Sequence, residues 1–250
     1  MKLVLIILFL FLSIPVYAVT DTFQGSSVTT DTYISEDNTT TNYGGETTFY
    51  CVSAFSNHRF TTLLKFDISS IPSTATVSDA TLTLDLVSGF SNDSFTLYLF
   101  RAFKPWVEGT SLSDGATWNS WDHTNSKEWG VAGANSTNDS GVDNSLDASG
   151  DDRVATETAS VAKSSFTSPG EAAFNSASLT ALVQGWINGT MTNNGVVETS
   201  TYSNPEGFCG SSENATEGNR PLLSVTYTIP EAAVSTVNKS LKNATLYGFN

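Results

Sequence analysis

Short stretches in which apolar and polar residues alternate constrain the fold of this chain more than any other feature. Between residues 60 and 68, Phe60 and Leu64 fall on one face of an extended chain, while Lys65 and Asp67 fall on the other. A period of two residues is typical of β-strands with one buried and one solvent-facing side. Further candidate strands cover residues 32–34, 47–52, 81–86, 95–100, 195–202 and 222–229. Repeated short strands between turn residues predict an all-β sandwich.

One segment has a helical period instead. Its apolar residues follow the spacing i, i+3, i+4, i+7: Leu179, Leu182, Val183 and Trp186. This spacing predicts a short amphipathic helix, with Ser178 as its start signal and Asn188-Gly189 as its stop signal. We expect the helix to cover one end of the sandwich and to place Trp186 in the core.

The chain is polar but weakly charged. It has 250 residues, of which 34 are Ser, 34 Thr and 19 Asn, and it carries 11 basic against 25 acidic residues, a net charge of −14. Nucleic-acid binding depends on Lys and Arg displacing counterions, so nucleic acid is excluded as a partner. Anionic lipids and polymers are disfavoured unless a local basic patch or bound cations intervene. Glycans and divalent cations remain compatible with this composition.

The N-terminal residues resemble a secretory signal. Lys2 precedes the apolar run 3–12, Pro15 follows it, and Val16 and Ala18 are the small residues that signal peptidase requires. We therefore expect cleavage after Ala18 and an extracellular location. The alternative is an uncleaved anchor, although ten apolar residues are short for a membrane span. The expected organisation is a signal peptide (1–18), one domain (19–229) and a tail or linker (230–250), with no membrane span after cleavage.

An extracellular location allows the cysteines to form a disulfide and the asparagines to be glycosylated. Cys51 and Cys209 are expected to form a disulfide, with two buried thiols as the alternative. The number of Asn-x-Ser/Thr sequons exceeds chance only slightly, so occupancy depends on the source organism. The candidate glycosylation sites are Asn38, Asn92, Asn135, Asn138, Asn188, Asn214, Asn238 and Asn243.

Several motifs in a fixed order carry a family resemblance. They are Asp31-Thr32-Tyr33-Ile34, Asn42-Tyr43-Gly44, residues 63–72, Ala80-Thr81-Leu82-Thr83-Leu84, Trp106-Val107-Glu108-Gly109, Ala116-Thr117-Trp118-Asn119, residues 179–186 and Asn219-Arg220-Pro221-Leu222-Leu223. In this order they resemble the DNRLRE, or disaggregatase-related, domain, which is also carbohydrate-binding module family 96. The resemblance implies a jelly-roll β-sandwich on a secreted or surface protein. Some members bind polysaccharides such as alginate, whereas the acidity of this chain makes an anionic polymer an awkward ligand.

The segment 110–170 has little periodicity and is rich in Asn, Asp, Ser and Gly, which is typical of functional or mobile loops. Sugar recognition combines flat apolar rings with amide or carboxylate groups. The candidate ligand-binding residues in this segment are Trp121, His123, Trp129, Asn119 and Asp122. The alternative is that these tryptophans pack the segment onto the sandwich. Trp106 and Trp118 belong to the family motifs and are expected to be structural.

The same segment holds a candidate calcium site. Asp139, Asp143, Asp147 and Asp151 recur every four residues, and hard cations take oxygen ligands of this kind. The spacing is not that of an EF-hand loop, and the Gly and Ser content argues against a helix that would align the carboxylates. A solvated acidic loop is the alternative. No other cofactor is expected.

Catalysis finds little support. Glu108, Glu198 and Glu206 are possible members of a glycosidase pair, but the sequence does not place any two of them together. His58 and His123 are too few for a zinc site. We therefore expect a secreted, noncatalytic carbohydrate-binding or adhesive module. The alternative is a structural cell-surface or filament subunit that assembles with itself or other surface proteins by edge-strand pairing, through the segment 19–30 or the tail.

Overall fold

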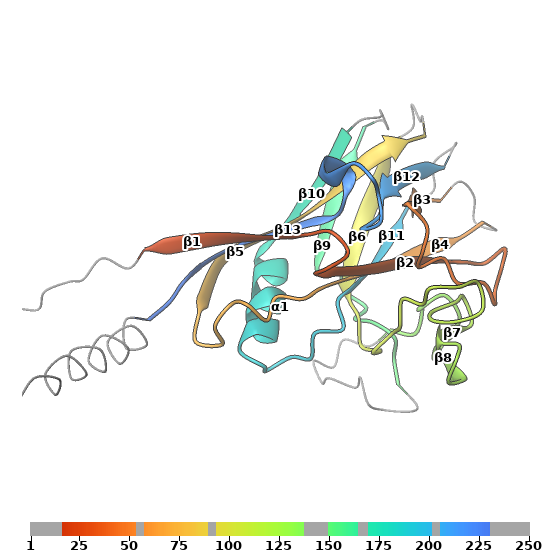
Figure 1. Ribbon diagram of the computed structural model, residues 1–250, viewed down its shortest axis with the longest axis horizontal. Helices are drawn as coiled ribbons and strands as arrows, with labels where there is room; N and C mark the ends of the chain where they lie inside the picture. The colour runs from red at the N-terminus through yellow and green to blue at the C-terminus, as the bar shows by residue number, and fades with distance from the viewer. Residues whose placement is uncertain are drawn as a thin grey trace, which may run out of the picture.

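The computed structural model describes residues 17–53, 58–89, 94–137, 150–164, 170–201 and 206–230 (Figure 1). These residues form an all-β sandwich with one α-helix, as the sequence predicts. The elements are β1 (Ala18–Gln24), β2 (Thr29–Ser35), β3 (Thr48–Val52), β4 (Phe60–Phe66), β5 (Thr76–Ser88), β6 (Phe95–Arg101), β7 (Ser120–Asp122), β8 (Lys127–Glu128), β9 (Ala159–Lys163), β10 (Gly170–Asn175), α1 (Ala177–Ile187), β11 (Val196–Ser200), β12 (Gly207–Gly210), the 3-10 turn η1 (Glu217–Asn219) and β13 (Leu222–Thr228).

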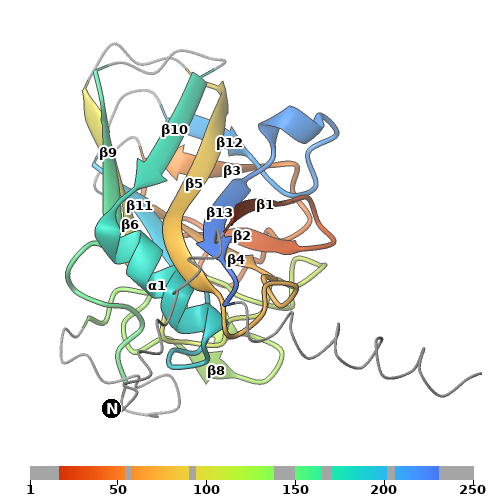
Figure 2. The ribbon, with the colours of Figure 1, turned by 90° about the vertical axis from the view of Figure 1, so that its left-hand side faces the viewer.

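Two antiparallel sheets face each other in a jelly-roll topology. Sheet B has the order β2-β4-β11-β6-β9. In sheet A, β10 lies on one side of β5, while β12 followed by β3 and β13 followed by β1 lie on the other (Figure 2). The eight strands of the jelly roll are β3, β12, β5 and β10 against β4, β11, β6 and β9. Strands β1, β2 and β13 extend this frame, and β7 pairs with β8 outside it.

The inner faces of both sheets form the main core. Leu82, Leu84 and Leu86 of β5 are buried, whereas Thr83 and Asp85 between them are partly exposed. Their partners across the sandwich include Leu64, Leu97, Leu99 and Val196 of sheet B. The period of two residues thus predicted both the strands and their buried sides. Strands β1, β7, β8, β9, β10 and β12 were not predicted.

Helix α1 packs beside β5 and closes one end of this core, as expected. Leu179, Leu182, Val183 and Trp186 are all buried. The expected start signal was wrong by two residues: the Ser176 side chain, not that of Ser178, accepts a hydrogen bond from the Leu179 N–H at 2.9 Å. The helix has eleven residues, and no helix in the described part of the chain is long and apolar enough to cross a membrane.

A second core lies on the outer face of sheet B. There Leu63, Phe100 and Val197 are covered by tryptophans from the segment between β6 and β9. Trp106 donates its indole N–H to the Asn194 carbonyl at 2.9 Å, and Trp129 donates to the Thr117 carbonyl at 2.8 Å. The described residues 103–137 and 150–158, called the cover below, therefore form a packed layer. Over residues 110–137 and 150–158 the segment is packed onto sheet B, because apolar side chains of that sheet need covering there, and this corrects the expectation of a mobile loop for these residues.

The expected disulfide is confirmed. Cys51 of β3 and Cys209 of β12 are bonded, with their Cα atoms 5.8 Å apart and a sequence separation of 158. The two strands are neighbours in sheet A, and the pairing shifts register between Gly207 and Phe208. The bond therefore closes a loop that includes most of the jelly roll.

Removing this disulfide should destabilise the fold strongly. Closing a loop of this length restricts the unfolded chain, and the chain-entropy model assigns about 5 kcal/mol to it. We expect the double variant Cys51→Ala/Cys209→Ala to have a much lower midpoint of urea unfolding than the parent. Treating the parent with a reductant should give the same midpoint. An unchanged midpoint in both experiments would contradict the prediction.

Candidate functional site

The cover leaves part of the outer face of sheet B open. In one row across the sheet, Ser160 of β9 lies opposite Tyr98 of β6, which lies opposite Thr199 of β11. The residues of this area, called the open strip below, are Thr96, Tyr98, Ser160, Ala162, Thr199 and Thr201, and each is partly or largely exposed. Three strands with spacings of about 4.8 Å present hydroxyl groups and one aromatic ring side by side.

A polar pocket of about 190 Å³ lies beside the open strip, where the cover ends. Strands β4 and β11 form its floor and the cover forms its wall. The lining residues are Ser53, Arg59, Phe60, Thr61, Trp118, Asn135, Arg153, Thr199 and Ser200. Two of the four arginines in the chain meet in this small space. None of the described residues that line it is acidic.

Backbone pairing and side-chain contacts both fix the position of Arg153 in the pocket. Isolated bridges pair it with Ala102 and Thr137, and its Nε donates to the Ala134 carbonyl at 3.2 Å. The guanidinium carbon lies 3.9 Å from the centre of the Phe100 ring, a cation–π contact. Among the described residues, no carboxylate lies within ion-pair distance of Arg153. Burial lowers the pKa of this guanidinium, and the charge of Asp152 partly opposes that shift.

Arg59 has a different environment. Its guanidinium forms two hydrogen bonds with the Glu36 carboxylate, at 2.9 and 2.7 Å, and lies 5.2 Å from the centre of the Trp118 ring. These bonds lower the pKa of Glu36 and compensate the Arg59 charge. Asn135 completes the wall, with its amide nitrogen donating to the Ala132 carbonyl at 2.9 Å. The pocket therefore combines one ion-paired cation, one cation with no described carboxylate within ion-pair distance, and an amide.

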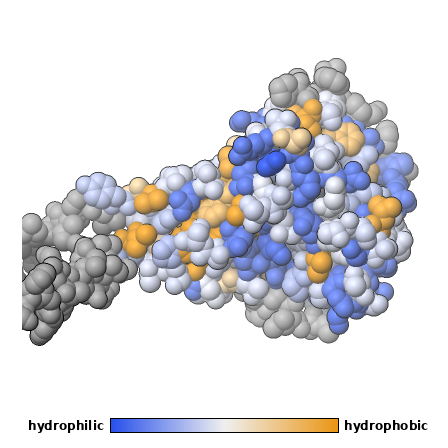
Figure 3. All heavy atoms as spheres, in the orientation of Figure 1, coloured by the Kyte–Doolittle hydropathy of each residue, from blue (hydrophilic) through white to orange (hydrophobic). Residues whose placement is uncertain are grey.

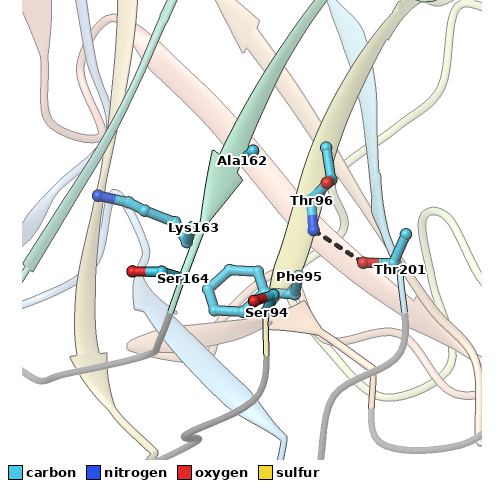
Figure 4. Close-up of a pocket in the computed structure, with 7 residues that line it drawn as sticks. All are labelled: Ser94, Phe95, Thr96, Ala162, Lys163, Ser164 and Thr201. Atoms are coloured by element: carbon cyan, nitrogen blue, oxygen red, sulfur yellow. Dashed lines mark hydrogen bonds between the residues drawn. The ribbon is translucent and has the colours of Figure 1, made fainter.

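A wider hollow of about 680 Å³ lies at the other end of the open strip (Figure 4). Thr96, Ala162 and Thr201 belong both to the strip and to this hollow. The Thr96 N–H donates to the Thr201 hydroxyl at 2.7 Å, which ties β6 to the end of β11. The strip thus connects the hollow with the arginine pocket along one face.

The predicted ligand-binding residues lie around the β7–β8 hairpin. Several of their side chains are buried or hydrogen-bonded within the protein. Trp121 and His123 are partly exposed and Asn119 is exposed. The Asp122 carboxylate is buried and accepts hydrogen bonds from the backbone and side chain of Asn125, at 3.2 and 2.7 Å. Trp129 is only 6% exposed and belongs to the second core. For Trp129 the structure agrees with the packing alternative.

Of the predicted calcium ligands, only Asp151 lies within the described residues. Its carboxylate accepts a hydrogen bond from the Ser136 hydroxyl at 3.0 Å. Asp139, Asp143 and Asp147 lie outside the described residues, so calcium at that position stays a prediction. Four sequon asparagines are also outside them: Asn92, Asn138, Asn238 and Asn243. Of the others, Asn38 and Asn188 are exposed, and Asn135 and Asn214 are half-buried.

Three carboxylates meet at a separate place, between β2, the cover and the loop after β12. Oxygens of Asp31, Glu108 and Glu213 lie within 4.8 Å of one another. Glu108 accepts the Asp31 N–H at 2.7 Å, and the Asp31 carboxylate accepts the Ser212 N–H at 2.8 Å. Oxygen ligands of this kind suit a hard cation. Within the described residues, this is the one group of three side chains that could hold a metal ion.

Burial dominates the electrostatics of this carboxylate group. It raises the pKa of Asp31 to about 8, with further contributions from Glu213 and Glu108. It also raises the pKa of Glu108 to about 7, which the neighbouring Lys65 partly opposes. Glu198 of β11 is not a member of this group. It is 1% exposed, and burial raises its pKa well above the ordinary value. Glu108 belongs to the carboxylate group, whereas Glu198 lies in strand β11.

The arginine pocket was not predicted from the sequence. Each arginine is isolated in the chain, and only the folding of the cover onto sheet B brings Arg59 and Arg153 together. The available signal was scarcity: arginines are few in a chain that is strongly acidic, so two of them near non-periodic segments were worth attention. Tyr98 and Thr199 were recognisable only as outward-facing residues of predicted strands.

The fold and this surface define a β-sandwich module with an open polar face. The family model of carbohydrate-binding module family 96 matches residues 22–189, well over half of the chain. The chain belongs to this family, as its motifs indicated. A search of curated proteins finds no match.

The carboxylate group should make stability depend on pH. Because the folded-state pKa values of Asp31 and Glu108 lie above the ordinary 3.8 and 4.5, their contribution to stability is complete below about pH 4 and is lost as the pH rises toward 8. We expect the free energy of unfolding, measured in a chelating buffer, to fall over this range. Asp31→Asn should flatten the fall. The exposed Glu128→Gln should leave it unchanged, and an equal slope in both variants would contradict this cause.

Proposed function

We propose that the protein is a secreted, noncatalytic module that binds a polysaccharide chain along the open strip, with the arginine pocket as its anchoring subsite. Membership of a carbohydrate-binding family supports the class of ligand. The observation that carries the site is the position of Arg153, beside Phe100 and facing a space that Trp118, Asn135 and Thr199 also line. Hydroxyl-rich ligands match this mixture of rings, amide, hydroxyls and a guanidinium fork.

The geometry also supports binding without turnover. Hydrolysis of a glycosidic bond requires two carboxyl groups on either side of it. The described lining of the pocket contains no carboxylate, and the nearby Glu36 is held by Arg59. The ligand is then retained by contacts that leave its bonds intact.

Replacing Arg153 should weaken binding. We expect Arg153→Gln to lower the affinity for a polysaccharide that retains the parent protein by about tenfold or more, because a hydrogen bond to a charged group contributes about 1.5–3 kcal/mol. Affinity gel electrophoresis over a panel of neutral and acidic polysaccharides gives the measurement. The exposed Lys127→Gln removes the same charge elsewhere and should bind as the parent does. Arg153→Lys, which keeps the charge but not the planar fork, should give an intermediate affinity.

A second pair of variants separates the open strip from the hairpin patch. Tyr98→Ala removes the ring in the middle of the strip and should reduce retention on the same polysaccharide, whereas Trp121→Ala should leave it nearly unchanged. Unfolding midpoints of both variants show whether the fold is intact. The opposite pattern, with binding lost only in Trp121→Ala, would move the site to the β7–β8 hairpin.

A further inference from the structure

One edge of sheet A is unpaired in the described chain. Strand β1 pairs with β13 over seven consecutive residue pairs without a register shift, and no described strand lies on its other side. Figure 1 shows β1 and the end of β13 reaching away from the body of the sandwich. An edge strand exposes a row of backbone N–H and C=O groups that can pair with another strand.

This edge lacks the features that usually prevent such pairing. Residues 18–24 contain no proline, lysine or glycine, and their one charge, Asp21, accepts a hydrogen bond from the Tyr227 hydroxyl at 2.8 Å. Val19 is 40% exposed. Figure 3 shows apolar residues along this projecting part of the molecule. A regular, partly apolar edge of this kind favours the addition of a strand.

The chain itself contains a segment that fits the edge. Residues 231–250 follow β13 after Ile229 and Pro230, and Tyr227 near the end of β13 lies opposite Val19 of β1. The segment carries two lysines and one glutamate, whereas the whole chain has a net charge of −14. It also contains residues with high β-propensity, such as Val234, Thr236 and Val237. Its charge therefore complements the acidic domain.

Strand direction decides which copy provides the segment. Because β13 is antiparallel to β1, a tail that turned back along β1 of its own chain would run parallel to β1. A tail from a second copy can run antiparallel, which is the more stable pairing. We propose that residues 231–250 of one copy add as an antiparallel strand to the free edge of β1 in a second copy. Such a head-to-tail contact is heterologous, so repetition builds a linear assembly.

Disulfide trapping between two different chains tests this pairing. The acceptor chain ends at Pro230 and carries Thr22→Cys on β1, where Thr22 is exposed. The donor is the full chain with a cysteine placed in turn at Val234, Thr236 and Asn238. We expect a donor–acceptor dimer on a non-reducing gel, with one donor position dominating. In the control acceptor, Ser160→Cys places the cysteine on β9, an exposed edge strand of sheet B, and the yield should be several times lower.

Two outcomes would overturn the proposal. The first is an equal yield from the Thr22→Cys and Ser160→Cys acceptors, which indicates random collision. The second is a full chain carrying Thr22→Cys and Thr236→Cys that closes its own disulfide as a dilute monomer, which assigns the tail to its own β1. Polysaccharide retention by the chain ending at Pro230 is measured in parallel. Because the open strip lies on the other sheet, retention should persist whichever way the trapping experiment turns out.

Discussion

The packing of the cover onto the outer face of sheet B is the interaction on which the functional surface depends. Leu63, Phe100 and Val197 face away from the sandwich core, and three tryptophans of the cover shield them from water. Burying an aromatic side chain contributes a few kcal/mol, so this second core can hold a segment with little secondary structure. The cover ends before β9, and the pocket and the open strip exist because it ends there.

Polar contacts fix the position of the cover on the sandwich. The Asn42 side chain donates to the carbonyls of Glu108 and Ala116, and Glu108 in turn accepts the Asp31 N–H. Gly109 has a φ of +78°, and a Cβ there would lie 2.6 Å from Asn42 Oδ1, so glycine is required in this turn. The motif residues Asn42, Glu108 and Gly109 therefore hold the cover against the sandwich at this junction.

The parts of the fold that were predictable are those with a strong local pattern. Strand β5 alternates leucine and polar residues, so its buried side follows from sequence alone. Strand β12 is the short Gly207–Gly210 segment, and its pairing depends on β3 and β5, which lie far away in the chain. The site was less predictable for the same reason. Trp121 and Trp129 are eight residues apart in similar surroundings, and only tertiary packing makes one partly exposed and the other buried.

For the polysaccharide site proposed above, charge acts at two ranges. At short range, Arg153 offers a guanidinium with no described carboxylate within ion-pair distance, although the charge of Asp152 acts on it, and it suits an acidic or hydroxyl-rich group. At long range, the net charge of −14 repels a densely anionic chain, and this repulsion extends over a Debye length of about 8 Å at physiological salt. The balance favours chains that are neutral or carry widely spaced acidic groups. Added salt screens the repulsion more than the half-buried contact, so at the proposed site we expect it to strengthen binding of the more acidic chains selectively.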